Sequence, residues 1–380
     1  MQLVLSEDQE LLAKTAGDFL SERSPVARLR GLRDSQDATG FSRELWKEMA
    51  ALGWVGITFP ESVGGAGMGF AELAVVMERL GRVLAPEPFL STVLLGGEAL
   101  RLGGSEAQRA HWLPRLVEGD AVLSLAHQEP GARFDLAVVA TRAEPAGEGF
   151  RLQGEKIGVL DGAVADALVI PARQTGADEA REGVTLFLVP ADAPGLAVER
   201  QSRVDSRGAA RLRLDGVPVD TEAIVGESGQ GVELLETVVD HATLGLAAEM
   251  LGSMSEAFER TLDYLKQRQQ FGSVIGSFQA LKHRAARMFI EVELARSAVL
   301  AAARAVDAGA DDASRLVSLA KARCSDTAML VAYEAVQMHG GIGMTDEHEI
   351  GFFLKRARVA ELTFGDAAWH RDRWARLCGY

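Results

Sequence analysis

The spacing of apolar residues changes twice along this 380-residue chain, and this change restricts its fold more than any other feature. Before about residue 120 and after residue 231, apolar residues recur at the 3.6-residue period of amphipathic helices. In between, they form short segments that Gly, Pro and Asp interrupt, which is typical of strands. The sequence therefore predicts an α+β fold with an N-terminal helical domain (1–120), a middle β domain (121–231) and a C-terminal four-helix bundle (232–380).

Local patterns indicate individual elements. Ser6 and Gln9 form a capping box. The helix that follows is expected to bury one face formed by Leu11, Leu12, Thr15, Ala16, Phe19 and Leu20. Alternation around Leu212 and Leu214 predicts a half-exposed strand, and the run 184–189 predicts a buried one.

Composition excludes several classes of protein. The formal net charge of −14 lacks the basic character that nucleic-acid binding requires, so no nucleic-acid partner is expected. No apolar run is long enough to span a bilayer, and the first residues do not resemble a secretion signal, so a cytoplasmic protein without a membrane partner is expected. The two cysteines, Cys324 and Cys378, support neither a disulfide framework nor a zinc site.

Two polar segments in the C-terminal third combine arginine, glutamine and glycine at expected helix ends. The first is Arg268-Gln-Gln-Phe-Gly272, followed by Phe278-Gln279, and the second is Gln337-Met-His-Gly-Gly341. A guanidinium group forks onto phosphate oxygens, and glycines let backbone N–H groups approach a ligand closely. These segments suit an anionic, planar ligand that carries adenine. The alternative is that Arg268 and Phe271 only end a helix and fill the core.

Together these segments resemble the acyl-CoA dehydrogenase family, and the resemblance extends over the whole chain. In that family they hold the pyrophosphate and adenosine end of the FAD of the neighbouring subunit. The resemblance therefore implies FAD as cofactor, an acyl-CoA substrate and an electron-transfer flavoprotein as electron acceptor. It assigns the FAD contacts to Arg268, Gln270, Phe271, Gln279, Gln337, Gly340 and Gly341.

The segments that hold the flavin ring in this family are altered here. The family segment Thr-Glu-Pro-Gly-Ala-Gly-Ser-Asp corresponds to Gln128-Glu-Pro-Gly-Ala-Arg-Phe-Asp135, in which two bulky side chains replace Gly-Ser. The family segment Trp-Ile-Thr-Asn-Gly corresponds to Gly158-Val-Leu-Asp-Gly162, which follows Gly154-Glu-Lys156. Gly158 cannot stack on a flavin, and Leu160 has no hydroxyl group to bond its N5 region.

The usual catalytic base is also missing. In the family a base, most often a glutamate before a glycine, removes the α-proton while hydride leaves the β-carbon for flavin N5. Phe364 occupies that position in Leu362-Thr-Phe-Gly-Asp366, and it cannot accept a proton. Some relatives place the base where Ala242 stands here.

Four other titratable residues are candidates by position. Asp366 is a candidate for a displaced base. Asp240 aligns with an aspartate that some relatives use near CoA, although the arginine expected three residues later is Thr243. His241 and Glu249 are further candidates. For each of these residues a solvated, capping or core role is the alternative.

These patterns favour α,β-desaturation of an acyl-CoA by a subunit that completes the FAD site of a homologous partner chain in a heterotetramer. Leu362–Asp366, His339–Thr345 and Glu129–Arg133 resemble the small subunits of bacterial heteromeric acyl-CoA dehydrogenases, including pimeloyl-CoA dehydrogenase small subunits. The alternatives are a self-sufficient homotetrameric dehydrogenase, a catalytically silent scaffold, and a flavin-dependent oxidase or monooxygenase on the same fold.

Overall fold

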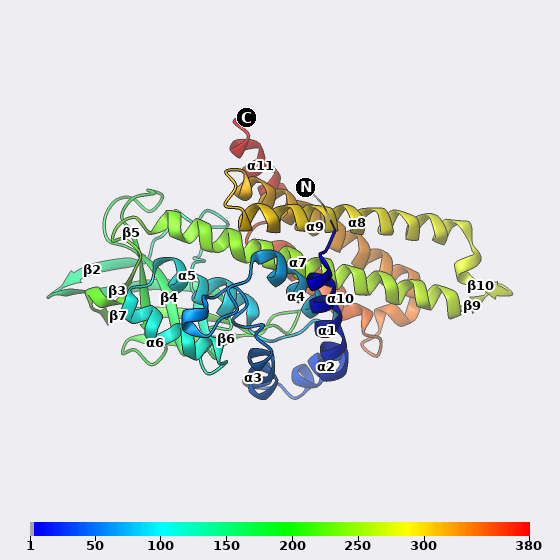
Figure 1. Ribbon diagram of the computed structural model, residues 1–380, viewed down its shortest axis with the longest axis horizontal. Coiled ribbons are helices and arrows are strands. Elements are labelled where there is room, and N and C mark those ends of the chain that lie inside the picture. The colour runs from blue at the N-terminus through cyan, green and yellow to red at the C-terminus, as the bar shows by residue number, and fades with distance from the viewer. Residues whose placement is uncertain (1–3) are drawn as a thin grey trace. The chain divides into compact units, whose positions relative to one another are not determined.

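The computed structural model describes residues 4–380, which form two compact units. The helical unit contains residues 4–35, 69–85 and 243–380, and the sheet unit contains residues 36–68 and 86–242. The predicted α+β class, with helical, β and helical segments in that order, is confirmed (Figure 1). Both units combine segments from different predicted domains, so the boundaries at residues 120 and 231 stay a prediction.

The helical unit is built from long helices joined by short turns. Its helices are α1 (Glu7–Arg23), α2 (Val26–Asp34), α4 (Phe70–Arg82), α8 (Gln279–Asp307), α9 (Ala313–His339), α10 (Ile350–Leu362) and α11 (Ala367–Leu377). Helix α7 (Gly231–Gln267) begins in the sheet unit and ends in the helical unit. Helices α8, α10 and α11 all pack on α9.

Two ion pairs fix the direction of α8 relative to α9. Arg284 near the start of α8 pairs with Glu334 near the end of α9, and Glu291 pairs with Arg323 at 3.1 Å. Because the residue numbers rise on one helix as they fall on the other, the two helices are antiparallel. The start of α8 therefore lies beside the end of α9.

The contacts at the start of helix α4 explain the glycine at position 69, which precedes the helix. The backbone N–H groups of Phe70 and Ala71 donate to the Asp307 carboxylate at 2.5 and 2.9 Å, so a side chain from α8 satisfies the free N–H groups of this helix end. A Cβ atom at Gly69 would lie 2.6 Å from Asp307 Oδ2. A larger residue at position 69 would push the carboxylate away.

The first helix confirms one prediction and corrects another. Ser6 and Gln9 form the predicted capping box. Ala16 and Leu20 are buried as predicted, but Leu11 is 64% exposed and Thr15 is also exposed. Gln9 and Ala13 are the other buried positions of α1. The Gln9 amide donates to Glu72 of α4 at 2.8 Å, so the buried face of α1 includes a polar contact with the helix on which it packs. The packing partner, and not apolar content alone, selects the buried face.

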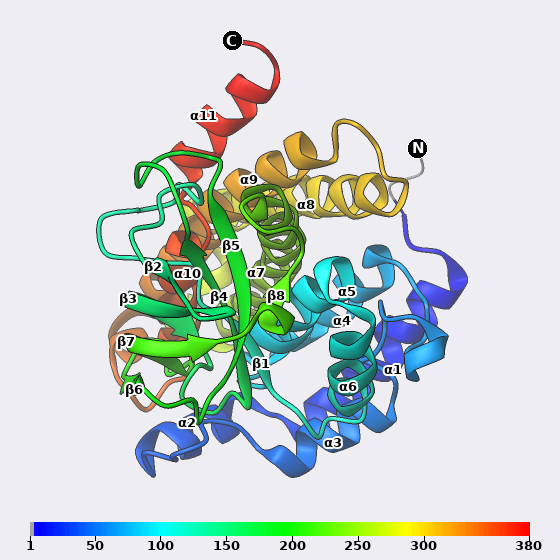
Figure 2. The same cartoon turned by 90° about the vertical axis from the view of Figure 1, so that its left-hand side faces the viewer.

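The sheet unit contains an open mixed sheet (Figure 2). Its strands are β1 (Leu123–Leu125), β2 (Arg142–Ala146), β3 (Gly149–Leu160), β4 (Ala167–Arg173), β5 (Val184–Pro190), β6 (Leu196–Gln201), β7 (Ala209–Val219) and β8 (Ile224–Val225). The strand order is β6-β7-β3-β2-β4-β5-β8, and β1 pairs with β4. Helices α3 (Arg43–Ala51), α5 (Glu98–Gly103) and α6 (Glu106–Val117) and a π-helix (Phe89–Gly97) complete the unit.

The two strand patterns predicted from sequence are confirmed. In β7, Leu212 and Leu214 are buried while Arg213 and Asp215 are exposed. In β5, every residue from Val184 to Val189 is buried. Within the described part of the chain, no helix has the length and apolar character that a membrane crossing needs.

Candidate functional site

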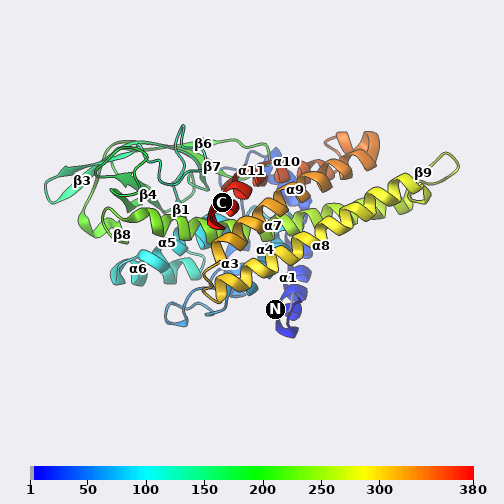
Figure 3. The same ribbon diagram turned by 90° about the horizontal axis from the view of Figure 1, so that it is seen from above.

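A short hairpin extends from the end of α7 and carries the first polar segment (Figure 3). Strands β9 (Gln269–Gln270) and β10 (Ser273–Val274) pair around the two-residue loop Phe271-Gly272. Phe271 has a φ of 55° and is 91% exposed. A bulky residue in the left-handed region is uncommon and costs energy, and here a two-residue hairpin loop requires a positive φ at both Phe271 and Gly272.

The second polar segment lies at the same end of the helical unit as this hairpin. Gln279 opens α8 and Gln337 stands in the last turn of α9, and both lie beyond the Arg284–Glu334 ion pair toward the same end of the two helices. The Arg268 backbone N–H donates to Tyr264 O at 2.9 Å, and the Tyr264 ring stacks on His339 beside Gly340. The structure therefore brings together residues that are about 70 positions apart in sequence.

We call these seven predicted contacts the exposed edge: Arg268, Gln270, Phe271, Gln279, Gln337, Gly340 and Gly341. Every one of them is exposed. Among the described residues, no carboxylate forms an ion pair with Arg268. A Cβ atom at Gly340 or Gly341 would meet no atom within 4 Å, so the backbone here faces open space. An unpaired guanidinium, an exposed ring, three amides and accessible backbone suit a phosphate and adenine group.

The altered ring segments lie in the sheet unit and are joined by a buried ion pair. Lys156 Nζ contacts Glu129 Oε1 at 2.5 Å, and both side chains are almost fully buried. Glu129 also accepts the N–H groups of Ala140 and Thr141 at 2.7 and 3.2 Å. Burial alone would raise the pKa of Glu129, but the Lys156 charge and the hydrogen bonds from Lys156, Thr141 and Ala140 together outweigh it and lower this pKa. The pair fixes the two segments to each other.

Beside this ion pair, the Gln128 side chain occupies the space left by the absence of a side chain at Gly158. Gly158 has a φ of 61°, and a Cβ atom there would lie 3.0 Å from Gln128 Oε1. The Gln128 side chain therefore lies where a side chain at position 158 would begin. Leu160 is buried and its carbonyl oxygen accepts the Ser124 hydroxyl at 2.6 Å. These residues offer no aromatic ring and no hydroxyl group at the positions of Gly158 and Leu160.

The turn at the predicted base position is held by buried donors. Phe364 is buried at a φ of 60°. Lys321 Nζ donates to Gly365 O at 2.7 Å and to Glu361 O at 3.0 Å, and His370 Nε2 donates to Phe364 O at 3.1 Å. Burial lowers the pKa of Lys321 to about 7. These hydrogen bonds hold the strained backbone of the turn in place. The Phe364 side chain itself has no atom that can accept a proton.

The other candidate bases are engaged in contacts. Asp366 caps α11 by accepting the Trp369 N–H at 2.8 Å. Asp240 is buried in α7. Its neighbour His241 donates from Nδ1 to the buried Glu98 at 2.6 Å, and Glu249 pairs with Arg356 at 2.9 Å. A catalytic role for Asp366 or Asp240 stays a prediction.

Burial of His370 predicts sensitivity to acid. Burial, then the Lys321 and Arg373 charges, lower the pKa of His370 to about 2, whereas the unfolded chain takes up this proton near pH 6.5. Between these values the unfolded state binds one more proton, so stability falls as pH falls. From pH 6.5 to 4.5 this group costs about 2–3 kcal/mol. We expect urea unfolding to show a shallower acid dependence in His370→Gln, and an unchanged one in His111→Gln, an exposed control on α6.

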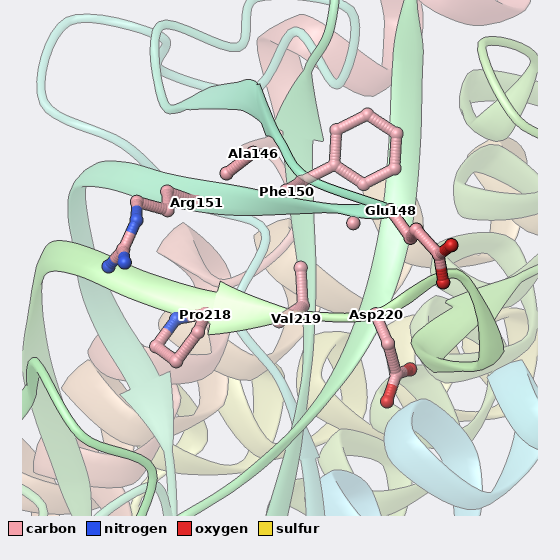
Figure 4. A pocket seen from close by; sticks show the side chains of 8 residues that line it. Ala146, Glu148, Phe150, Arg151, Pro218, Val219 and Asp220 are labelled. Carbon is pink, nitrogen blue, oxygen red and sulfur yellow. The ribbon is translucent and has the colours of Figure 1, made fainter.

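A shallow pocket of about 350 Å³ on the sheet unit is separate from these segments (Figure 4). It lies between the β2–β3 turn and the end of β7. Its lining residues are Ala146, Glu148, Gly149, Phe150, Arg151, Pro218, Val219 and Asp220. None of the residues predicted from sequence to form a site lines this pocket.

Comparison with known proteins places this architecture among its relatives. Family models for the N-terminal, middle and C-terminal domains of acyl-CoA dehydrogenase match residues 6–120, 124–217 and 229–378. Mitochondrial isovaleryl-CoA dehydrogenase of Pongo abelii is 32% identical over 97% of this chain and 88% of its own. The ChsE4–ChsE5 complex of Mycobacterium tuberculosis has a TM-score of 0.90 and 29% identity, covering 100% of this chain and 99% of the matched chain. PigA with FAD and proline has a TM-score of 0.92 and 27% identity, covering 100% and 99%.

Proposed function

This chain belongs to the acyl-CoA dehydrogenase family of FAD-dependent oxidoreductases, and on that premise we propose that it completes the FAD site of a homologous, catalytically equipped partner subunit. The assembly desaturates an acyl-CoA thioester between its α and β carbons. The chain acts in the manner of the small subunits of heteromeric bacterial enzymes of the pimeloyl-CoA dehydrogenase type. An electron-transfer flavoprotein takes the electrons.

The observation that carries this proposal is the contrast between two sets of residues. The exposed edge of the helical unit offers Arg268, amides and open backbone, which fit a pyrophosphate and adenine. The ring-facing segments of the sheet unit do not fit a flavin, because Gln128 lies against Gly158 and Leu160 lacks a hydroxyl group. A chain with only the first set needs another molecule to supply the second.

Six residues of the exposed edge have a definite task in this proposal. When bound, FAD accepts the hydride from the substrate. Arg268 neutralises the pyrophosphate charge, and Phe271 offers an apolar surface to the adenine. The side-chain amides of Gln279 and Gln337 donate and accept hydrogen bonds with the adenosine end, and Gly340 and Gly341 leave their backbone accessible. Arg268 is the one full charge of the edge and should carry most of the affinity.

The proton-abstracting group comes from the partner in this account. Phe364 occupies the family position of the base, and a phenyl ring cannot accept the α-proton. The partner should therefore carry a glutamate before glycine, together with the Trp-x-Thr segment that this chain lacks. Similarity to the ChsE4–ChsE5 complex supports an assembly of unlike subunits.

Arg268→Ala tests the proposed role of the exposed edge. A charge-assisted hydrogen bond contributes about 1.5–3 kcal/mol, so its loss should weaken FAD binding about ten- to a hundredfold in the assembly with the partner. Flavin retained after gel filtration measures the effect. Arg376→Ala is the matched control, because Arg376 is exposed on α11 of the same unit and pairs with Asp372 of that helix. Equal flavin retention in both variants would contradict the proposal.

A further inference from the structure

A stack of three rings lies beside the exposed edge, with His339 buried at its centre and Tyr264 and His348 half-buried. The rings of Tyr264 and His339 are stacked, with centroids 4.5 Å apart and an angle of 29° between their planes. The His348 ring also contacts His339, with the ring centroids 4.6 Å apart and the two planes tilted by 53°. His339 is almost completely buried. These residues come from α7, from the end of α9 and from the loop before α10, so the stack joins three segments of the helical unit.

The stack connects both halves of the exposed edge through the backbone. Tyr264 O accepts the N–H of Arg268, which begins the hairpin that carries Phe271. His339 is followed at once by Gly340, whose φ of 63° ends α9. The position of Arg268 relative to Gly340 therefore depends on the contact between the Tyr264 and His339 rings. A shift of either ring would move the segment that carries Arg268 and Phe271 away from the segment that carries Gln337, Gly340 and Gly341.

Hydrogen bonds fix which nitrogen of each histidine carries the proton. His339 Nδ1 donates to Ala335 O at 2.7 Å, because a carbonyl oxygen can only accept. His348 Nδ1 accepts the Ile350 N–H at 3.2 Å, so this nitrogen has no proton. Protonation of His348 at Nδ1 would break its bond to the start of α10. Protonation of His339 would add a charge inside the stack.

The charged groups around the stack come from α7 and from the loop before α10. Arg260 of α7 pairs with Glu256 of the same helix at 2.8 Å and with Glu349 at 2.6 Å. Its guanidinium group lies 5.3 Å from the centre of the Phe353 ring of α10. Glu349 directly follows His348 and is already engaged by Arg260. A proton on either histidine would therefore face a guanidinium group and the other imidazole.

We propose that the Tyr264–His339–His348 stack is the positioning element of the exposed edge, and that its protonation releases FAD from the assembly in acid. This inference rests on the proposed function, since it concerns the same edge. Tyr264 and His339 act through the backbone of Arg268 and Gly340, and they are positioning residues without contact to the cofactor. Aromatic stacking keeps the two halves in register at neutral pH.

The direction of the pH effect follows from the surroundings of the histidines. Burial lowers the pKa values of both His339 and His348, and the charge of Arg260 lowers them further. A loosened edge, in which these rings meet water, takes up protons near pH 6.5. The ordered edge therefore binds fewer protons, and it is disfavoured as pH falls below about 6.5. Each histidine can weaken FAD binding by up to about tenfold for each pH unit below that value.

Variants at position 339 separate positioning from general stability. We expect His339→Ala to weaken FAD binding about three- to tenfold at pH 7.5, because it removes the stacking contact. His339→Phe keeps a ring and should bind FAD much more tightly than His339→Ala. FAD titration of the assembly measures the affinity, and thermal unfolding of the same samples shows whether stability changes in parallel. His111→Ala on α6 is the control for an exposed histidine.

The pH dependence is tested with a double variant in which neither position 339 nor position 348 can take up a proton. His339→Phe combined with His348→Asn keeps a ring and an acceptor for the Ile350 N–H, since asparagine can bond two residues onward. Wild-type affinity for FAD should fall between pH 7.5 and 5.5, whereas the double variant should stay flat. Equal affinity of His339→Ala and wild type, or an equal pH slope in the double variant, would overturn the inference. If Arg268→Ala also leaves FAD bound, the proposed function itself fails; if only the His339 variants have no effect, the stack inference fails alone.

Discussion

Replacing Lys156 by methionine is expected to lower the free energy of unfolding by about 3–5 kcal/mol, because it leaves the Glu129 carboxylate buried without its cation. Glu129 keeps the N–H groups of Ala140 and Thr141, but these neutral donors do not replace a full charge. Burial would then raise the pKa of Glu129, so part of the loss should disappear when the carboxyl group is protonated in acid.

Urea unfolding of the full chain at pH 7.5 measures this loss. Lys47→Met is the matched control, because Lys47 forms an exposed ion pair with Asp120 in the same unit at 2.6 Å, and such pairs contribute about 0–1 kcal/mol. The double variant Lys156→Met with Glu129→Gln removes both charges and should recover part of the stability. If Lys156→Met were no less stable than Lys47→Met, the ion pair would not be what holds the two segments together.

The second large effect concerns catalysis. We expect the purified chain alone to desaturate no acyl-CoA at a measurable rate, and the assembly with its homologous partner to be at least about a thousandfold faster, since a positioned base alone contributes about a hundred- to ten-thousandfold. Phe364→Glu in this chain should not restore activity without the partner, because Gln128, Gly158 and Leu160 still leave no ring site. Substitution of the partner's glutamate should abolish activity in the assembly.

Reduction of an electron-transfer flavoprotein, with acyl-CoA as substrate, measures this activity, and oxygen consumption in parallel detects an oxidase. Full activity of the chain by itself would establish a self-sufficient dehydrogenase and contradict the account. An assembly that stays inactive and colourless with every homologous partner would establish a scaffold.

The order of helical and β segments was predictable because each depends on local periodicity. A buried strand such as β5 has an unbroken run of apolar residues, whereas in a half-exposed strand such as β7 apolar and polar residues alternate. Both patterns are visible between neighbouring residues in the sequence. The buried face of α1 was not predictable in the same way, because the Gln9–Glu72 contact joins residues that are 63 positions apart. Sequence patterns report what a helix contains, whereas its packing partner decides which face is buried.

The exposed edge was predicted from short motifs, and the structure brings all seven residues to one end of the helical unit. The sequence patterns did not predict the stacked rings of Tyr264 and His339 beside this edge. Tyr264 stands four residues before Arg268, one helical turn away, a spacing that places two residues on the same face of a helix. The pairing of Tyr264 with His339 depends on the packing of α7 against the end of α9, which no local pattern contains.

For the segments at the family's flavin-ring position, the sequence showed the substitutions but not the contacts between them. The replacement of Thr and Trp by Gln128 and Gly158 was visible in sequence, but the contact between the two substitutions was not. The buried pair of Glu129 and Lys156 also joins residues from both segments, and each alone resembles an ordinary surface charge. Such compensation becomes visible only when strand pairing has brought the segments together.

The ratio of FAD to protein, measured for the full chain alone and for its complex with a homologous partner, tests the central claim most directly. The account predicts a colourless chain that becomes part of a yellow complex with one FAD for each pair of unlike chains, because this chain supplies the exposed edge and the partner supplies the ring site. Tight binding of one FAD by each copy of this chain alone would contradict it.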